Sequence, residues 1–244
     1  MRIYLTIQNL SVILLIFFIF TVHLDAQDNS NEVIPEIIEW SAIAATSGVE
    51  IYIRFQDPFF EKTLMNSPYT NLSYKENSVS TLWIVAVDAA ALASIAFIPN
   101  TGGGQSSEET SYKNIKGFLE TVAVTNLITD FSKNVVGRKR PDYDDRVSLK
   151  VDIPEGRQSF WSGHASNAFA TATYMSLFTV EHLGEKDNYL LKVSLPLVLY
   201  GAASFVGWTR IDDNRHFVDD VIVGSIVGTL TAGFFYGVQN YLGK

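Results

Sequence analysis

The chain of 244 residues is long enough for one domain with a sizeable core, since 47% of its residues are hydrophobic and only 18% are charged. Its formal net charge of −8 disfavours a nucleic-acid partner, because such binding relies on basic residues that neutralise phosphates. The sequence contains no cysteine, which excludes disulfides, thiolate nucleophiles and cysteine-based zinc sites, and its four histidines lack the close spacing of a zinc cluster.

The first segment combines a basic start with an apolar run. Arg2 precedes nearly unbroken apolar residues from Leu10 to Val22, and Ala26 offers a small residue at a cleavage point. This pattern predicts a signal peptide over residues 1–26, with an uncleaved membrane anchor as the alternative. Either interpretation sends the following residues out of the cytoplasm.

Residues 27–80 are predicted to form an exported N-terminal region. It begins with polar residues at 27–36, and apolar residues at helical spacing over 37–49 then predict a helix at a membrane interface. The breakers Asp57-Pro58 and Ser67-Pro68 predict that residues 56–78 are mostly loop.

Five apolar segments predict the helices of a second region, residues 81–244. They lie at 81–98, 114–134, 164–181, 188–208 and 217–241. A flexible link at Gly102–Gly104 follows the first segment, and an irregular, charged stretch covers 137–160. The expected fold is all-α, a helical bundle of about five to six helices with no sheet.

Three of these segments approach the length needed to cross a bilayer, which is about 20 apolar residues. We therefore expect membrane integration, although the mean hydropathy of +0.13 also fits the buried helices of a soluble bundle. If all five segments cross, the loops at 137–160 and 209–216 lie on the same side as residues 27–80, outside the cytoplasm. The basic residues would then contradict the positive-inside rule unless they bind an anion.

The basic residues of this acidic chain are clustered within one short stretch. The cluster comprises Lys133, Arg138, Lys139, Arg140 and Arg146. Such an island predicts a local anion site. Lys133 and Arg140, with Arg210 from the other loop, offer donors suited to phosphate oxygens. Ser162 and Gly163 open a helix, where free backbone N–H groups favour an anion and glycine permits a close approach.

Two histidines are candidates for separate chemical roles. His216 and Asp220 are spaced i, i+4, which on a helix predicts a hydrogen bond that fixes the imidazole tautomer and frees the other nitrogen for attack. Asp219 is the weaker carboxylate candidate. His164 heads another helix and could protonate a leaving oxygen. A nucleophile and an acid are thus available without a metal, so no metal or other cofactor is expected.

The order and spacing of these residues resemble the type 2 phosphatidic acid phosphatase superfamily, which includes class A acid phosphatases and vanadium haloperoxidases. Its pattern is Lys-x6-Arg-Pro, then Pro-Ser-Gly-His, then Ser-Arg-x5-His-x3-Asp. The chain departs from it at two positions, where Trp161 replaces proline and Thr209 replaces serine. The matching residues are Lys133, Arg140, Pro141, Ser162, Gly163, His164, Arg210, His216 and Asp220.

The resemblance implies a role for each matched side chain. His216 would attack phosphorus and form a phosphohistidine, Asp220 would orient it, and His164 would protonate the leaving alcohol. The phosphoryl oxygens would be held by Lys133, Arg140, Ser162, Gly163 and Arg210. Trp161 and Thr209 affect the shape of the loops and so the choice of substrate, while every charged or nucleophilic group is retained.

The leading hypothesis is a phosphomonoesterase that acts on a lipid-linked phosphate or diphosphate, in the inner membrane with a periplasm-facing site. Alternatives are a soluble periplasmic acid phosphatase, a vanadium haloperoxidase and a non-enzymatic membrane protein. Three acids within the helices, Asp88, Glu120 and Asp130, are functional candidates if those helices span a membrane. Asp130 lies three residues before Lys133 and could pair with it, whereas Asp88 and Glu120 could equally make polar contacts between helices.

Overall fold

The computed structural model describes residues 33–60, 62–97, 107–182 and 189–242. Within these ranges the ordered backbone is helical and contains no strand, which confirms the predicted all-α class. The predicted signal peptide at 1–26, the residues 27–32 and the glycine link at 102–104 lie outside the described ranges.

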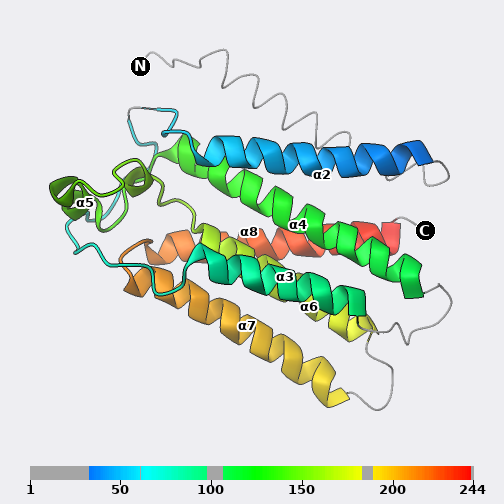
Figure 1. Cartoon of the computed structure of the whole chain (residues 1–244). Helices are drawn as coiled ribbons and strands as arrows, with labels where there is room; N and C mark the ends of the chain where they lie inside the picture. The colour runs from blue at the N-terminus through cyan, green and yellow to red at the C-terminus, as the bar shows by residue number, and fades with distance from the viewer. Residues whose placement is uncertain (1–32, 61, 98–106, 183–188, 243–244) are drawn as a thin grey trace.

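Most of the long helices run side by side along one direction, while the short helix α5 lies beyond one end of them (Figure 1). The helices are α2 (Val33–Arg54), α3 (Thr81–Phe97), α4 (Ser107–Val136), α5 (Tyr143–Leu149), α6 (Gly163–His182), α7 (Tyr189–Asp212) and α8 (Val218–Gly237). A 3₁₀ turn, η1 (Glu155–Arg157), follows α5, and a π turn, η2 (Val238–Leu242), continues α8.

The described residues contain seven α-helices, where the sequence predicted about five to six. The extra helix is α5, which lies within the stretch expected to be irregular and carries Asp144 and Asp145 in its first turn, where the helix dipole favours them. Helix α2 exceeds the predicted 37–49 at both ends, and α4 begins before residue 114. Helix α7 reaches Asp212, so Arg210 lies in its last turn and not in a loop.

Helix α6 occupies the centre of the bundle and packs against α3, α4, α7 and α8. The core beside it is aromatic. Tyr174 of α6 makes edge-to-face contacts with Phe118 of α4 and Tyr236 of α8, at centroid distances of 5.4 and 5.2 Å. All three side chains are almost fully buried, so this cluster fixes α6 against its neighbours.

Two glycines let α8 approach α6 closely. A Cβ at Gly228 would lie 1.9 Å from the carbonyl oxygen of Ser166, and one at Gly224 would lie 2.6 Å from that of Ser162. Small residues four apart commonly permit such backbone approach between apolar helices. The close approach brings together the beginning of α6, which carries His164, and the beginning of α8, which His216 precedes by two residues.

The long loop between α2 and α3 contacts the two loops that precede α6 and α8. The Leu72 N–H donates to Pro141 O at 2.9 Å, and the Ser78 N–H donates to Asp213 Oδ2 at 2.9 Å. The N-terminal region and the loops at 137–160 and 209–216 were expected to share one side of a membrane. Their contacts place them together at one end of the bundle (Figure 1).

Among the described helices, α7 and the stretch Val218–Tyr241 are long and apolar enough to cross a membrane, and α3 is a shorter apolar helix. Few residues of α7 are buried, which is unlike the core helix of a soluble protein. Large apolar side chains are exposed on α3 and α7, among them Leu82, Trp83, Leu197, Phe205 and Trp208. Long apolar helices with exposed apolar side chains favour a bundle embedded in a membrane, as predicted.

Candidate active site

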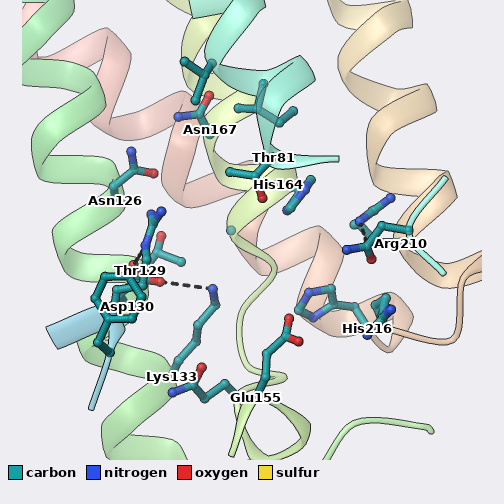
Figure 2. A pocket seen from close by; sticks show the side chains of 18 of the residues that line it. Thr81, Asn126, Thr129, Asp130, Lys133, Glu155, His164, Asn167, Arg210 and His216 are labelled. Atoms are coloured by element: carbon teal, nitrogen blue, oxygen red, sulfur yellow. Dashed lines mark hydrogen bonds and ion pairs between the residues drawn. The ribbon is translucent and has the colours of Figure 1, made fainter. Parts of the chain in front are cut away.

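A cavity of about 750 Å³ opens at the end of the bundle where the loops meet. Six of the eight predicted site residues line it, and four of these are labelled in Figure 2. The six are Lys133, Arg140, Gly163, His164, Arg210 and His216. The other two, Ser162 and Asp220, are fully buried and do not line it.

Each of the three predicted phosphate-binding cations is held by a carboxylate. Lys133 Nζ lies 3.1 Å from Asp130 Oδ1, Arg140 Nη2 lies 3.0 Å from Glu155 Oε1, and Arg210 Nη2 lies 2.8 Å from Asp213 Oδ2. Figure 2 shows the Lys133 side chain extended from α4 with its ammonium end toward Asp130. The three side chains come from α4, a loop and α7, so they surround the cavity from different directions.

Asp213 fixes the position of the Arg210 guanidinium. It also accepts hydrogen bonds from the Ser78 hydroxyl at 2.5 Å and the Ser78 N–H at 2.9 Å. Arg210 Nη1 donates to Asn77 Oδ1 at 3.3 Å. The loop after α2 therefore sets the direction of a cation on α7.

The imidazole of His216 is oriented by a backbone carbonyl. His216 Nδ1 lies 2.7 Å from Ser159 O, and because a carbonyl only accepts, Nδ1 carries the proton and Nε2 is left unprotonated. The pKa of His216 is lowered to about 4, mainly by burial and also by the cations Arg140 and Lys133, while the carboxylate of Asp220 opposes the shift. A neutral imidazole with a free Nε2 is a nucleophile.

Asp220 differs from the prediction in its contacts. His216 precedes α8, whereas Asp220 is the third residue of that helix, so the two do not share a helical face. Their closest approach, Nδ1 to Oδ2, is 3.8 Å, which is too long for a hydrogen bond. The carboxylate instead accepts from the Phe217 N–H at 3.0 Å and the Ser159 hydroxyl at 2.6 Å. Asp220 thus shapes the turn that presents His216 and acts on the imidazole through its charge.

Arg138 was not predicted as a site residue, although it belongs to the basic cluster. It is 2% exposed, and its Nη1 donates to Asp220 Oδ1 at 2.5 Å and to Asp219 Oδ2 at 2.8 Å. Its guanidinium also lies 4.3 Å from the centre of the Phe217 ring. Arg138 therefore holds the first turn of α8 in place. Its positive charge is balanced by the carboxylates of Asp219 and Asp220.

His164 faces the cations across the cavity (Figure 2). Its Nε2 is buried and has no hydrogen-bond partner within the described part of the chain. Burial lowers the pKa of His164 to about 3, and nearby Arg210 and Lys133 reinforce that effect. The free site therefore holds a neutral imidazole, and an anion bound among the cations would favour its protonation.

Ser162 and Gly163 form the start of α6. The Ser162 hydroxyl accepts the Ala165 N–H at 3.4 Å, a capping contact, and its contact with phosphate stays a prediction. A Cβ at Gly163 would lie 3.1 Å from Lys133 Nζ, so the ammonium group rests against the bare backbone.

The variant Gly163→Ala tests this close approach. The added methyl group would push Lys133 Nζ away by a few tenths of an ångström, because the side chain can move more readily than the helix. We expect KM for a phosphomonoester to rise about tenfold while the protein still folds, since misplaced binding groups weaken binding steeply. Steady-state kinetics measure this change, and an unaltered KM would contradict the placement of Lys133.

The three acids noted in the helices have distinct partners. Asp130 contacts Lys133, as the spacing suggested, and also accepts from Arg54 Nε of α2 at 2.9 Å. Asp88 of α3 accepts from the Thr171 hydroxyl of α6 at 2.6 Å. Glu120 of α4 accepts from Gln239 Nε2 at 2.9 Å. All three thus join neighbouring elements, and Asp88 and Asp130 also line the cavity.

The two departures from the family pattern are accommodated locally. Trp161 Nε1 donates to Thr129 Oγ1 at 2.9 Å, which ties the loop before α6 to α4. Thr209 Oγ1 donates to Val206 O at 2.8 Å and lies 3.3 Å from Arg210 Nε. Neither change displaces a charged group from the cavity.

The family model of the PAP2 superfamily matches residues 115–244, which contain every predicted site residue. The chain belongs to the PAP2 superfamily. The resemblance drawn from the motifs is therefore confirmed, and no solved structure matches the chain significantly.

Curated members of the PAP2 superfamily are similar to this chain. Lipid phosphate phosphatase 1 of Arabidopsis thaliana is 30% identical over 219 residues, which cover 81% of this chain and 66% of the relative. Phospholipid phosphatase 2 of Homo sapiens is 32% identical over 141 residues, which cover 50% of this chain and 49% of the relative. The chain thus spans between about half and two thirds of the length of these relatives.

Proposed function

We propose that this PAP2-family chain is a metal-independent phosphomonoesterase that removes phosphate from a phosphorylated lipid. The observation that carries the proposal is the cavity that collects three cations and two histidines, one of them with a free, neutral Nε2. The names of relatives as lipid phosphate and phospholipid phosphatases support it.

In this mechanism the phosphoryl group sits among Lys133, Arg140 and Arg210, whose positive charges match its oxygens. His216 Nε2 attacks phosphorus, the bond to the leaving oxygen breaks, and a phosphohistidine forms. His164, protonated in the field of the bound anion, gives its proton to the departing alkoxide. A water then attacks phosphorus while His164 accepts its proton, the bond between phosphorus and His216 Nε2 breaks, and inorganic phosphate leaves.

The lipid preference follows from the shape of the cavity. Beyond the cations it continues between α3 and α4, where its lining includes Ile84, Val85, Leu92 and Val122. Helix α3 exposes apolar side chains such as Leu82 and Trp83 on its outer surface. An acyl or prenyl chain could therefore enter sideways from a bilayer while its phosphate reaches the cations.

The proposal extends to the chain's organisation and location. Residues 81–244 would form the phosphatase domain, preceded by a signal peptide or anchor at 1–26 and an exported region at 27–80. The active-site end of the bundle would face the periplasm, with the helices in the inner membrane. The basic residues at that end agree with this orientation, because they serve the phosphate and its supporting carboxylates.

Phosphate release by the purified full chain in detergent tests the function. The panel should contain phosphatidate, lysophosphatidate, a prenyl diphosphate and a water-soluble aryl phosphate, each with and without EDTA. We expect lipid phosphates to be hydrolysed in EDTA and vanadate to inhibit, because it mimics the five-coordinate transition state. A strict requirement for a divalent metal would contradict the mechanism, and turnover of the aryl phosphate alone would contradict the lipid assignment.

The pH profile provides a further prediction. Because the pKa of His216 is lowered to about 4, its neutral form persists as the pH falls and is lost only near that value. We expect kcat/KM to decline at low pH with a midpoint well below 6.5, the ordinary pKa of histidine. The profile is first corrected for the substrate's own second ionisation, near pH 6. Lys133→Met should move this midpoint to higher pH, because one of the cations that lower the pKa is removed. A midpoint at 6.5 in both proteins would contradict the assignment.

A further inference from the structure

A polar cluster lies in the cavity beyond the phosphate-binding cations. It consists of Asp88 on α3, Asn126 on α4 and Asn167 on α6, all of which line the cavity. In Figure 2, Asn126 and Asn167 lie in the upper half of the view, whereas Lys133 and Glu155 lie in the lower half. The proposed mechanism assigns no role to these three side chains.

One atom of this cluster is buried without a hydrogen-bond partner. Asn167 is 4% exposed, and its Oδ1 has no partner within the described ranges. The amide interacts with the carboxylate of Asp88, which also accepts from the Thr171 hydroxyl at 2.6 Å. Since a carboxylate only accepts, the NH₂ end of Asn167 faces Asp88, and Oδ1 is left as an unused acceptor in the cavity wall. Buried polar atoms of this kind usually have a partner, which indicates a ligand.

The cluster sits at the right depth for the carbon skeleton of a substrate. Asn167 follows His164 by three residues on α6, which is about 4.5 Å along the helix axis. Asn126 precedes Lys133 by seven residues on α4, which is about 10 Å. The apolar residues Leu92 and Val122 also line this part of the cavity. The amides therefore lie between the phosphate and the acyl chain.

We infer that Asn167, supported by Asp88, recognises a hydroxyl or N–H donor on the substrate's backbone, close to the phosphoester. This inference rests on the proposed function and narrows its substrate class. Asn167 Oδ1 is the acceptor that has no partner within the described ranges, so a donor on the substrate satisfies it. Ester carbonyls, which only accept, would leave Asn167 Oδ1 buried without a partner.

The favoured substrates are therefore lipid phosphomonoesters with a free donor near the phosphate. A lysophosphatidate supplies a glycerol hydroxyl and a ceramide phosphate supplies an amide N–H, whereas phosphatidate supplies only carbonyls. A site that hydrogen-bonds a substrate hydroxyl strongly rejects an analogue that lacks this hydroxyl. An apolar pocket discriminates less against an analogue that merely carries an added hydroxyl.

The experiment compares a lysophosphatidate with its deoxy analogue, in which hydrogen replaces the free hydroxyl. For the natural chain we expect kcat/KM for the hydroxyl form to be higher by at least about tenfold. In Asn167→Leu the ratio should fall to about one, because the acceptor is removed. Asn167→Gln keeps both the acceptor oxygen and the NH₂ group that faces Asp88, and should keep a preference for the hydroxyl form. A ceramide phosphate and its N-methylated analogue test the N–H source in the same way.

Thr179→Val is the matched control. Thr179 is on the same helix, is 1% exposed and also has a hydroxyl without a partner in the described ranges, but it does not line the cavity. Its loss should leave the hydroxyl-to-deoxy ratio unchanged. Equal rates for both substrates in the natural chain, or an unchanged ratio in Asn167→Leu, would overturn the inference.

A binding measurement separates this inference from the proposed function. Non-hydrolysable phosphonate analogues of the hydroxyl and deoxy lipids are titrated calorimetrically, which requires no turnover. Tighter binding of the hydroxyl form that disappears in Asn167→Leu supports the recognition site even if no phosphate is released. Equal binding alongside normal phosphatase activity would reject the site and leave the proposed function intact. If Asn167→Leu does not fold, Asn167→Ala carries the same expectation.

Discussion

Replacing His216 by alanine is expected to lower kcat for any phosphomonoester by on the order of 10⁵-fold or more, because single nucleophile knock-outs remove nearly all covalent catalysis. In the structure no other side chain described in the cavity pairs a free imidazole nitrogen with an anchored Nδ1 as His216 does. His216→Asn is the companion variant, since its amide can still donate to Ser159 O while the attacking nitrogen is lost. Steady-state phosphate release and mass spectrometry of a rapidly quenched, phosphorylated chain measure the effect.

His182 provides the matched control for this experiment. It is also buried, and its Nδ1 lies 2.9 Å from the backbone carbonyl of Phe178, but it does not line the cavity. His182→Asn should therefore retain turnover within a few-fold of the natural chain. Appreciable turnover by either His216 variant, or a phosphorylated residue elsewhere, would show that the nucleophile has been misassigned.

Replacing Gly228 by alanine is expected to destabilise the bundle severely. The added Cβ would lie 1.9 Å from Ser166 O and 3.0 Å from Ala170 N, which are backbone atoms of α6 that no rotamer change can move. Overpacking of this type costs about 3 kcal/mol or more. Separation of α6 from α8 would also draw His164 away from His216, so activity should fall even in molecules that remain folded.

Gly233 offers the control on the same helix. A Cβ there would meet nothing within 4 Å among the described atoms. Gly233→Ala should therefore be neutral or stabilising, because alanine is favoured over glycine inside a helix by about 1 kcal/mol. Thermal unfolding in detergent, followed by circular dichroism, compares the two variants. Equal melting temperatures would contradict the close packing of α6 and α8.

The sequence predicted which basic and histidine side chains would gather at one site, because the chemistry of phosphate transfer restricts which side chains can serve. Lys133, His164, Arg210 and His216 were all predicted, and all four line one cavity. Their convergence followed from the expected alternation of helices, which places the loops at one end. These aspects depend on residue type and helix order, both of which can be read along the chain.

The supporting contacts could not be predicted, because they depend on where helices begin and on partners distant in sequence. Asp220 was expected to bond His216 along one helical face, but α8 begins only at Val218, so its carboxylate bonds the Phe217 N–H instead. The supporting role of Arg138 could not be predicted, since its partner Asp220 lies 82 residues away. Nothing in the sequence around Asn77 and Ser78 showed that this loop would position Arg210.

The contact between Ser78 and Asp213 joins residues 135 positions apart and orients Arg210, one of the proposed phosphate-binding cations. Closing so long a loop is entropically costly and slow compared with the pairing of neighbouring helices. During folding the helical bundle can therefore assemble before this contact forms, and the anion-binding cavity would be among the last parts to reach its native geometry. A partly folded chain would then have a native-like helix content while it still lacks a competent phosphate site.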